Sequence, residues 1–220
     1  MSNLTNKNIL LCVTGGIAAY KAAELVRLLK TSNAFVKVLM TKSAQEFITP
    51  LTMQALSGEK VHTDLLSTEA EAAMGHIELA KWCDLIVIAP CSANSLSKIA
   101  EGRGDDLLSA VCLATESEIF IAPAMNQAMW KDKRTQKNLS KSIKAGLNII
   151  GPASGEQACG DVGDGRMTEP ADIVSEVEKT LEKGLLTGKK VIITAGPTQE
   201  MIDPVRYCLL YTSPSPRDTA

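Results

Sequence analysis

The sequence lacks the features that mark several large classes of protein. Among its 220 residues, 23 Lys and Arg stand against 25 Asp and Glu, so the net charge is -2 and there is no excess of positive charge to attract nucleic acid. No apolar run approaches the roughly eighteen residues of a membrane-spanning helix, and no apolar segment follows a basic N-terminal start. We therefore expect no nucleic acid and no membrane among its partners, and neither secretion nor membrane insertion.

The cysteines form no recognisable framework. They stand at positions 12, 83, 91, 112, 159 and 208, with no CxxC pair and none of the dense spacing of small secreted domains. Most lie in apolar stretches where buried cysteines are common, but Cys159 lies among glycines and aspartates in the segment ACGDVGDGRM, residues 158–167. We expect a cytoplasmic protein with reduced thiols and no metal site, in which Cys159 is exposed on a flexible loop.

Short runs of Val, Ile and Leu alternate with longer amphipathic stretches. We expect buried parallel strands at residues 8–13, 35–40, 84–89, 118–123, 147–152 and 191–196. Residues 17–32 have helical periodicity, with one apolar face made of Ala18, Ala22, Leu25, Val26 and Leu29. This alternation predicts an α/β fold with a doubly wound parallel sheet, whose ligands bind beyond the carboxyl ends of the strands.

Glycine and polar residues follow the first three predicted strands. Gly15 and Gly16 lead from the first strand into a helix, where backbone N–H groups could contact a phosphate, but the full GxGxxG pattern is missing and a simple tight turn fits as well. Hydroxyl and amide side chains follow the next two strands: Thr41, Ser43, Ser92, Asn94 and Ser95. Each could merely cap a helix. Their recurrence at successive strand ends favours FMN, a mononucleotide with a polar ribityl chain.

Two further segments contain candidate chemical groups. Asn126, in APAMNQAMW (122–130), follows a strand; its carboxamide can donate to a carboxylate and accept from an amide, but a helix cap is an equal alternative. From their spacing, Met129 and Trp130 would pack in a core or an interface. His76, in GHIELAKW (75–82), should begin a helix, and a lone histidine is more often structural than a catalytic base.

Five segments together carry a resemblance to a known family: TGGIAAYK, GHIELAKW, APCSANSLSKIAEG, APAMNQAMW and ACGDVGDGRM. In this order they resemble the flavin-dependent cysteine decarboxylases, and in particular the decarboxylase half of bacterial bifunctional coenzyme A biosynthesis proteins, over about residues 7–183. The resemblance implies a flavodoxin-like or Rossmann-like flavoprotein that assembles as a homotrimer or a multiple of three. It also implies FMN-dependent decarboxylation of phosphopantothenoylcysteine to phosphopantetheine.

The resemblance also implies roles for residues at matching positions. His76 and Cys159 would be catalytic, with Cys159 as a proton donor, and Asn126 and Met129 would bind the substrate. The implied FMN-binding residues are Gly15, Gly16, Ile17, Thr41, Ser92, Ala93, Asn94 and Ser95, with Ser43 as an alternative to Thr41.

The implied chemistry explains why such residues are needed. A cysteine carboxylate has no electron sink, but transfer of a hydride from its β-carbon to FMN, with loss of the thiol proton, would give a thioaldehyde that accepts the electrons left by CO₂. Return of the hydride would then give a saturated thiol. His76 would assist proton removal, and Cys159, whose thiol is mostly protonated near pH 7, would supply a proton to carbon. The glycines beside Cys159 would let its loop close over the substrate.

Two other functions remain open for such a chain. One is an oxidative peptidyl-cysteine decarboxylase that stops at the enethiol, and the other is a non-catalytic flavin-binding regulatory subunit. Because the stop-at-enethiol enzymes need no proton donor, the ACGD segment favours the full reaction. The long acidic extensions usual in the regulatory subunits do not occur in this sequence.

The last part of the chain reads differently. Residues 189–207, KKVIITAGPTQEMIDPVRY, resemble the opening of the ligase domain of bifunctional proteins, and the resemblance ends at Cys208. We expect an FMN-dependent decarboxylase domain at 1–183, a linker and truncated start of a ligase domain at 184–207, and a foreign, disordered tail at 208–220. Ligase activity is not expected.

Overall fold

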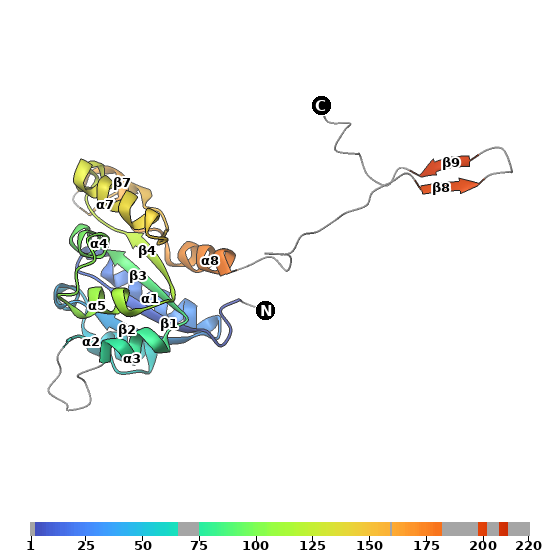
Figure 1. Ribbon diagram of the computed structural model, residues 1–220. Coiled ribbons are helices and arrows are strands. Elements are labelled where there is room, and N and C mark those ends of the chain that lie inside the picture. The colour runs from blue at the N-terminus through green and yellow to red at the C-terminus, as the bar shows by residue number, and fades with distance from the viewer. Residues whose placement is uncertain (1–2, 66–74, 159, 182–197, 202–206, 211–220) are drawn as a thin grey trace. The chain divides into compact units, whose positions relative to one another are not determined.

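The computed structural model describes residues 3–65, 75–158, 160–181, 198–201 and 207–210 (Figure 1). The chain divides into two units, Met1–Glu182 and Lys183–Ala220. In the second unit, β8 (Thr198–Met201) pairs antiparallel with β9 (Tyr207–Leu210). The elements of the first unit are β1 (Asn8–Val13), η1 (Ile17–Ala19), α1 (Tyr20–Thr31), β2 (Phe35–Met40), η2 (Lys42–Glu46), α2 (Pro50–Ser57), α3 (Gly75–Trp82), β3 (Leu85–Cys91), α4 (Ala93–Ala100), α5 (Leu107–Ala114), β4 (Glu118–Pro123), α6 (Gln127–Lys131), α7 (Lys133–Lys144), β5 (Asn148–Ile149), β6 (Ala153–Glu156), β7 (Val162–Arg166) and α8 (Pro170–Leu181).

The first unit is built on a five-stranded sheet in the order β2-β1-β3-β4-β5. All four neighbouring pairs are parallel, which confirms the predicted α/β class and the first five predicted strands. The fifth is shorter than expected, only Asn148–Ile149. The sixth predicted strand, 191–196, lies outside the described residues.

Helices cover both faces of the sheet (Figure 1). Alternate residues of the strands belong to the two cores on either side of it. In β1, Ile9, Leu11 and Val13 join a core with α1, α2 and α8, whereas Leu10 and Cys12 join the core with α3, α4 and α5. Strands buried on both faces need unbroken apolar runs. NILLCV and LIVIAPC are such runs, so the sequence predicted these strands clearly.

The helix α1 confirms the predicted apolar face. Ala22, Leu25, Val26 and Leu29 are buried in the core, and Ala18 packs against it from η1. Burying a large aliphatic side chain stabilises a fold by about 1.5–3 kcal/mol. The helix ends before Asn33, whose φ of 59° is left-handed, a conformation that asparagine tolerates at helix ends.

The glycine-rich segment 158–167 departs from the expected flexible loop. Part of it is the strand β7, which pairs antiparallel with β6. A Cβ on Gly165, whose φ is 131°, would overlap the carbonyl oxygen of Met125, and a Cβ on Gly163 would overlap the side chain of Gln127. These glycines therefore allow the hairpin to pack closely against residues 125–127. Cys159 itself lies outside the described residues.

A buried lysine joins the start of α1 to the segment after this hairpin. The Lys21 side chain is 8% exposed, and its Nζ lies 2.8 Å from Glu169 Oε1 and donates to the carbonyl of Met167 at 3.4 Å. Arg166 Nη2 also donates to Glu169 Oε1, at 2.8 Å. The hydrogen bond from Lys21 holds the pKa of Glu169 below its usual value, although burial opposes the shift.

We predict that Glu169→Gln lowers the free energy of unfolding at pH 7 by about 1 kcal/mol, because it removes a charge-assisted hydrogen bond. This figure is below the usual value for such a bond because the carboxylate is half-exposed and water screens its charge. Because the folded-state pKa lies below the ordinary value of 4.5, this stabilisation is present above that pH and is lost as pH falls through the folded-state pKa. Urea unfolding between pH 7 and 3 should therefore show the gap between wild type and variant closing in acid. The control, Glu176→Gln, removes an exposed pair with Lys179 and should change stability by less than about 0.5 kcal/mol. A gap that is constant with pH would contradict the assignment.

Candidate functional site

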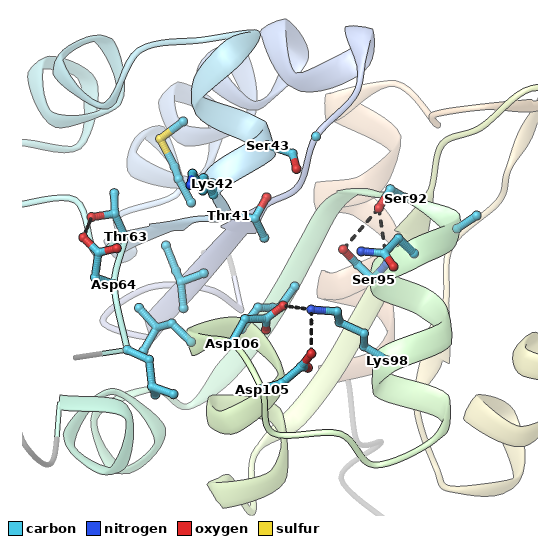
Figure 2. A pocket seen from close by; sticks show the side chains of 18 of the residues that line it. Thr41, Lys42, Ser43, Thr63, Asp64, Ser92, Ser95, Lys98, Asp105 and Asp106 are labelled. Atoms are coloured by element: carbon cyan, nitrogen blue, oxygen red, sulfur yellow. Dashed lines mark hydrogen bonds and ion pairs between the residues drawn. The ribbon is translucent and has the colours of Figure 1, made fainter. Parts of the chain in front are cut away.

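A cavity of ≈ 550 Å³ is lined by the segments that follow β1, β2 and β3 (Figure 2). The chain runs from β1 outward to β2 on one side, and through β3, β4 and β5 on the other, so the direction of strand order reverses between β1 and β3. In parallel α/β sheets, ligands bind at this reversal, beyond the carboxyl ends of the strands. The cavity therefore lies where the sequence predicted that function should be sought.

The cavity brings together many of the predicted site residues: Gly15, Thr41, Ser92, Ala93, Asn94, Ser95 and Met129. Ser43, the alternative to Thr41, lines it as well. Among the described residues, Gly16, Ile17, His76 and Asn126 are not part of the lining. The predicted residues that line the cavity thus come from the segments after four strands, β1, β2, β3 and β4.

The two glycines after β1 have different surroundings. A Cβ on Gly15 would lie 2.5 Å from the Cβ of Ser43, so its missing side chain makes room for the segment after β2. A Cβ on Gly16 would meet nothing within 4 Å. The next residue, Ile17, is 63% exposed. The backbone at Gly16 is therefore open to approach, whereas Gly15 is required by packing inside the protein.

Thr14 joins the segments after β1 and β3, and sequence reasoning missed it. Its side chain is fully buried; Oγ1 donates to the carbonyl of Pro90 at 2.8 Å and accepts from the backbone N–H of Ser92 at 2.9 Å. Both hydrogen-bonding roles of the hydroxyl are thereby used. Thr14 precedes the glycine pair in the TGGIAAYK segment, and this position was the signal that could have found it.

The predicted helix caps and the cavity lining are made by the same side chains. Ser92 Oγ accepts from the backbone N–H of Ser95 at 3.3 Å, capping α4, and donates to Ser95 Oγ at 3.1 Å. Thr41 Oγ1 accepts from the N–H of Ala44 at 3.3 Å and caps η2. Two helix starts therefore face one cavity, with hydroxyl groups held in fixed positions.

Charged residues that sequence reasoning missed line another part of the cavity (Figure 2). Lys98 Nζ lies 2.7 Å from Asp106 Oδ2 and 3.2 Å from Asp105 Oδ2. The hydrogen bond to Asp106 raises the pKa of Lys98. Burial raises the pKa of Asp106, but hydrogen bonds from Lys98 and Ser109 outweigh it and hold that pKa below its usual value. Lys98 and Asp106 are therefore both charged at neutral pH.

Asn126 caps a helix, one of the two roles that the sequence left open, and also contacts a carboxylate of the protein itself. Its Oδ1 accepts from the N–H of Ala128 at 2.8 Å and caps α6, while its Nδ2 donates to Asp161 Oδ2 at 2.8 Å. Asp161 belongs to the ACGD segment, in the turn between β6 and β7. The structure therefore joins two segments of the predicted site that are far apart in the sequence.

His76 lies outside the lining of the cavity, whereas Met129 is part of it. His76 lies in the first turn of α3, as predicted, and its Nδ1 is buried without a hydrogen-bond partner among the described residues. Met129 is 49% exposed and lines the cavity, which excludes the core packing that was one of the two alternatives its spacing suggested. The Nδ1 atom of His76 and the exposed side chain of Met129 could therefore each contact a bound ligand.

The four cysteines whose side chains are described are free thiols: Cys12, Cys83, Cys91 and Cys112. Burial raises the pKa of each, that of Cys112 to about 12, so all four are protonated and unreactive at neutral pH. Within the described ranges there is no cluster of three metal-ligating side chains, and no helix is long and apolar enough to cross a membrane.

Comparison with known families gives the class of protein. Residues 1–182 match the family described as Flavoprotein, so the chain belongs to the flavoprotein family. Residues 186–213 match the DNA/pantothenate metabolism flavoprotein C-terminal domain.

Two curated relatives show which members of this family the chain resembles. The chain is 53% identical over 213 residues to the coenzyme A biosynthesis bifunctional protein CoaBC of Vibrio parahaemolyticus, covering 97% of this chain and 53% of that protein. It is 50% identical over 212 residues to CoaBC of Escherichia coli K12, covering 96% and 52% respectively. The chain thus spans about half the length of the curated relatives it matches.

Solved structures give the same fold. A cysteine-to-serine mutant of PPC decarboxylase in complex with pantothenoylaminoethenethiol is 34% identical, with a TM-score of 0.71 over 81% of this chain and 100% of that one. The FMN-binding protein AtHal3 is 35% identical, with a TM-score of 0.69 over 81% and 98%. These similarities confirm the flavodoxin-like fold expected from the sequence.

We predict that Gly15→Ala destabilises the protein by about 1–3 kcal/mol, because the added methyl group overpacks the contact with Ser43. Gly16→Ala is the matched control and should change the free energy of unfolding by less than about 0.5 kcal/mol. Replacing Ser43 by Gly in the Gly15→Ala background should restore part of the loss. Urea unfolding measures all three variants. Equal stability of the Gly15→Ala and Gly16→Ala variants would show that the contact with Ser43 does not require glycine at position 15.

Proposed function

We propose that residues 1–183 form an FMN-dependent decarboxylase that converts phosphopantothenoylcysteine to phosphopantetheine in coenzyme A biosynthesis. The observation that carries the proposal is the cavity beyond β1, β2 and β3, because it gathers a glycine segment, fixed hydroxyl groups and helix starts at the reversal of strand order. Relatives of this half of the chain include CoaBC proteins and a PPC decarboxylase, which supports the substrate and the carboxy-lyase reaction.

The residues of the cavity fit FMN. Its volume of ≈ 550 Å³ is within the range of small-molecule sites, about 300–1,000 Å³. The hydroxyls of Thr41, Ser92 and Ser95 and the amide of Asn94 suit a ribityl chain. The open backbone at Gly16 admits close approach of a phosphate. The FMN-holding residues would be Gly15, Gly16, Ile17, Thr41, Ser92, Ala93, Asn94 and Ser95.

The proposed catalytic roles are those that the resemblance implies, and each suits the chemistry of its side chain. A flavin at this site would hold two electrons from the thiol-bearing carbon of the substrate while CO₂ leaves. Asn126 would donate a hydrogen bond from Nδ2 to the substrate carboxylate, with Met129 against the substrate. His76 would remove a proton during oxidation, and Cys159 would supply one to carbon. The buried, unpartnered Nδ1 of His76 supports a role for this imidazole outside the fold itself.

The rest of the proposal concerns assembly and the second unit. A homotrimer or a multiple of three would let neighbouring subunits complete the substrate site, and the cytoplasm is the proposed location. The match of residues 186–213 supports assigning 184–207 to the linker and start of a ligase-type domain. The boundary with a foreign tail at 208 falls within β9, and residues 211–220 lie outside the described residues.

The direct test is purification of the chain with FMN, followed by anaerobic addition of phosphopantothenoylcysteine. We expect a yellow protein, bleaching of the flavin spectrum, and release of CO₂ with phosphopantetheine as product. A protein that holds no FMN under saturating supply would overturn the proposal. An FMN-loaded protein that releases CO₂ but accumulates only the enethiol would assign it instead to the oxidative decarboxylases.

We predict that Cys159→Ser and His76→Asn block different stages. Cys159→Ser should still release CO₂ but form the saturated product at least about 100-fold more slowly, because the proton donor to carbon is lost. His76→Asn should slow CO₂ release itself by about 10²–10⁴-fold. Product analysis by mass spectrometry separates the two outcomes. Cys112→Ser, at a partly buried thiol that does not line the cavity, is the control and should preserve both steps. Normal phosphopantetheine formation by the Cys159→Ser variant would refute the donor role.

A further inference from the structure

The amide of Asn126 has a fixed orientation and already faces a carboxylate. A backbone N–H can only donate, so the contact from Ala128 at 2.8 Å fixes Oδ1 at the start of α6 and turns Nδ2 away from it. Nδ2 donates to Asp161 Oδ2, also at 2.8 Å. A carboxylate therefore occupies the position that the proposed function gives to the carboxylate of the substrate.

The surrounding contacts hold this pair without depending on it. The N–H of Met125 donates to the carbonyl of Gly165 at 2.9 Å, and the N–H of Gln127 donates to Gln157 Oε1 at 3.1 Å. The segment before α6 is thus joined to the hairpin on both sides of Asn126. Because Asp161 is exposed, its carboxylate can turn into solvent while these two hydrogen bonds stay in place.

We propose that Asp161 is a specificity residue that competes with the substrate carboxylate for the Nδ2 group of Asn126. This inference rests on the proposed function. Two carboxylates close to one amide group repel each other, so an incoming carboxylate must displace Asp161. After CO₂ leaves, the product carries no carboxylate and Asp161 returns to Asn126. The exchange weakens binding of the carboxylate form and leaves binding of the decarboxylated form unaffected.

A purely structural role for the contact gives a different expectation. If Asp161 only fastened the hairpin to α6, its loss would loosen the site and weaken both forms of the ligand alike. Competition predicts instead that loss of Asp161 strengthens ligand binding, and only for the form that carries the carboxylate. The comparison therefore needs two ligands that differ by one carboxylate.

The experiment measures binding to the FMN-loaded chain by isothermal titration calorimetry. The probes are phosphopantothenoylserine, in which a hydroxyl replaces the reactive thiol, and phosphopantothenoylethanolamine, which lacks the carboxylate. We expect Asp161→Asn and Asp161→Ala to bind the serine compound about three- to tenfold more tightly than wild type, the size expected for an exposed charge-assisted hydrogen bond. Affinity for the ethanolamine compound should be unchanged.

Two further variants separate the possible failures. Asp164→Asn makes the same charge change on β7 of the same hairpin and should alter neither affinity. Asn126→Asp keeps an acceptor for the N–H of Ala128 but removes the Nδ2 donor. It should therefore abolish any tighter binding of the serine compound relative to the ethanolamine compound. If wild type shows no such preference and Asn126→Asp changes nothing, the proposed contact of Asn126 with the substrate is wrong. If that contact holds but the Asp161 variants bind the serine compound no more tightly, or tighten both compounds equally, the competition is overturned.

Discussion

Parallel pairing of β1 with both β2 and β3 is the constraint on which the rest of the structure depends. It places three strand ends at one edge of the sheet, so the segments that follow them must share one region of space. The buried hydroxyl of Thr14 then fixes the spacing between two of these segments, because it bonds both Pro90 and Ser92. Gly15 allows the third segment to approach through Ser43. A cavity lined by three distant parts of the chain follows from these contacts.

The glycines of the chain serve two different purposes. Gly163 and Gly165 remove atoms that would overlap Met125 and Gln127, so they make the β6–β7 hairpin fit against the segment before α6. Gly16 has no such neighbour and leaves backbone accessible from outside. Because a run of glycines usually indicates a flexible chain, the sequence suggested a loose loop at 158–167. The packing instead indicates a hairpin held in place near Asn126, with Lys21 and Glu169 fastening the segment that follows.

Much of the architecture was predictable because strands that are buried on both faces of a sheet appear in the sequence as continuous apolar runs. Apolar runs such as NILLCV admit few alternatives, and the face of α1 containing Leu25 and Leu29 has clear helical spacing. The cavity-lining hydroxyls were predictable from their position after strands. The pairing of Lys98 with Asp105 and Asp106 was not, because a short charged segment on a loop is usually solvated and only the fold brings it to the cavity wall. The contact between Asn126 and Asp161 depends on hairpin register, which the sequence did not reveal.

The identity of residue 126 can be argued from its two contacts together. Serine or aspartate would cap α6 as well as asparagine does, since each offers an oxygen to the N–H of Ala128. Aspartate, however, has no proton to donate toward Asp161 and would add a second negative charge there. Serine has a single proton and a shorter reach. Only a short carboxamide accepts from the helix with one atom and presents a donor to a carboxylate with the other, because its planar geometry fixes the two directions relative to each other. The hydrogen bond that caps α6 through Oδ1 therefore also orients Nδ2 toward the carboxylate.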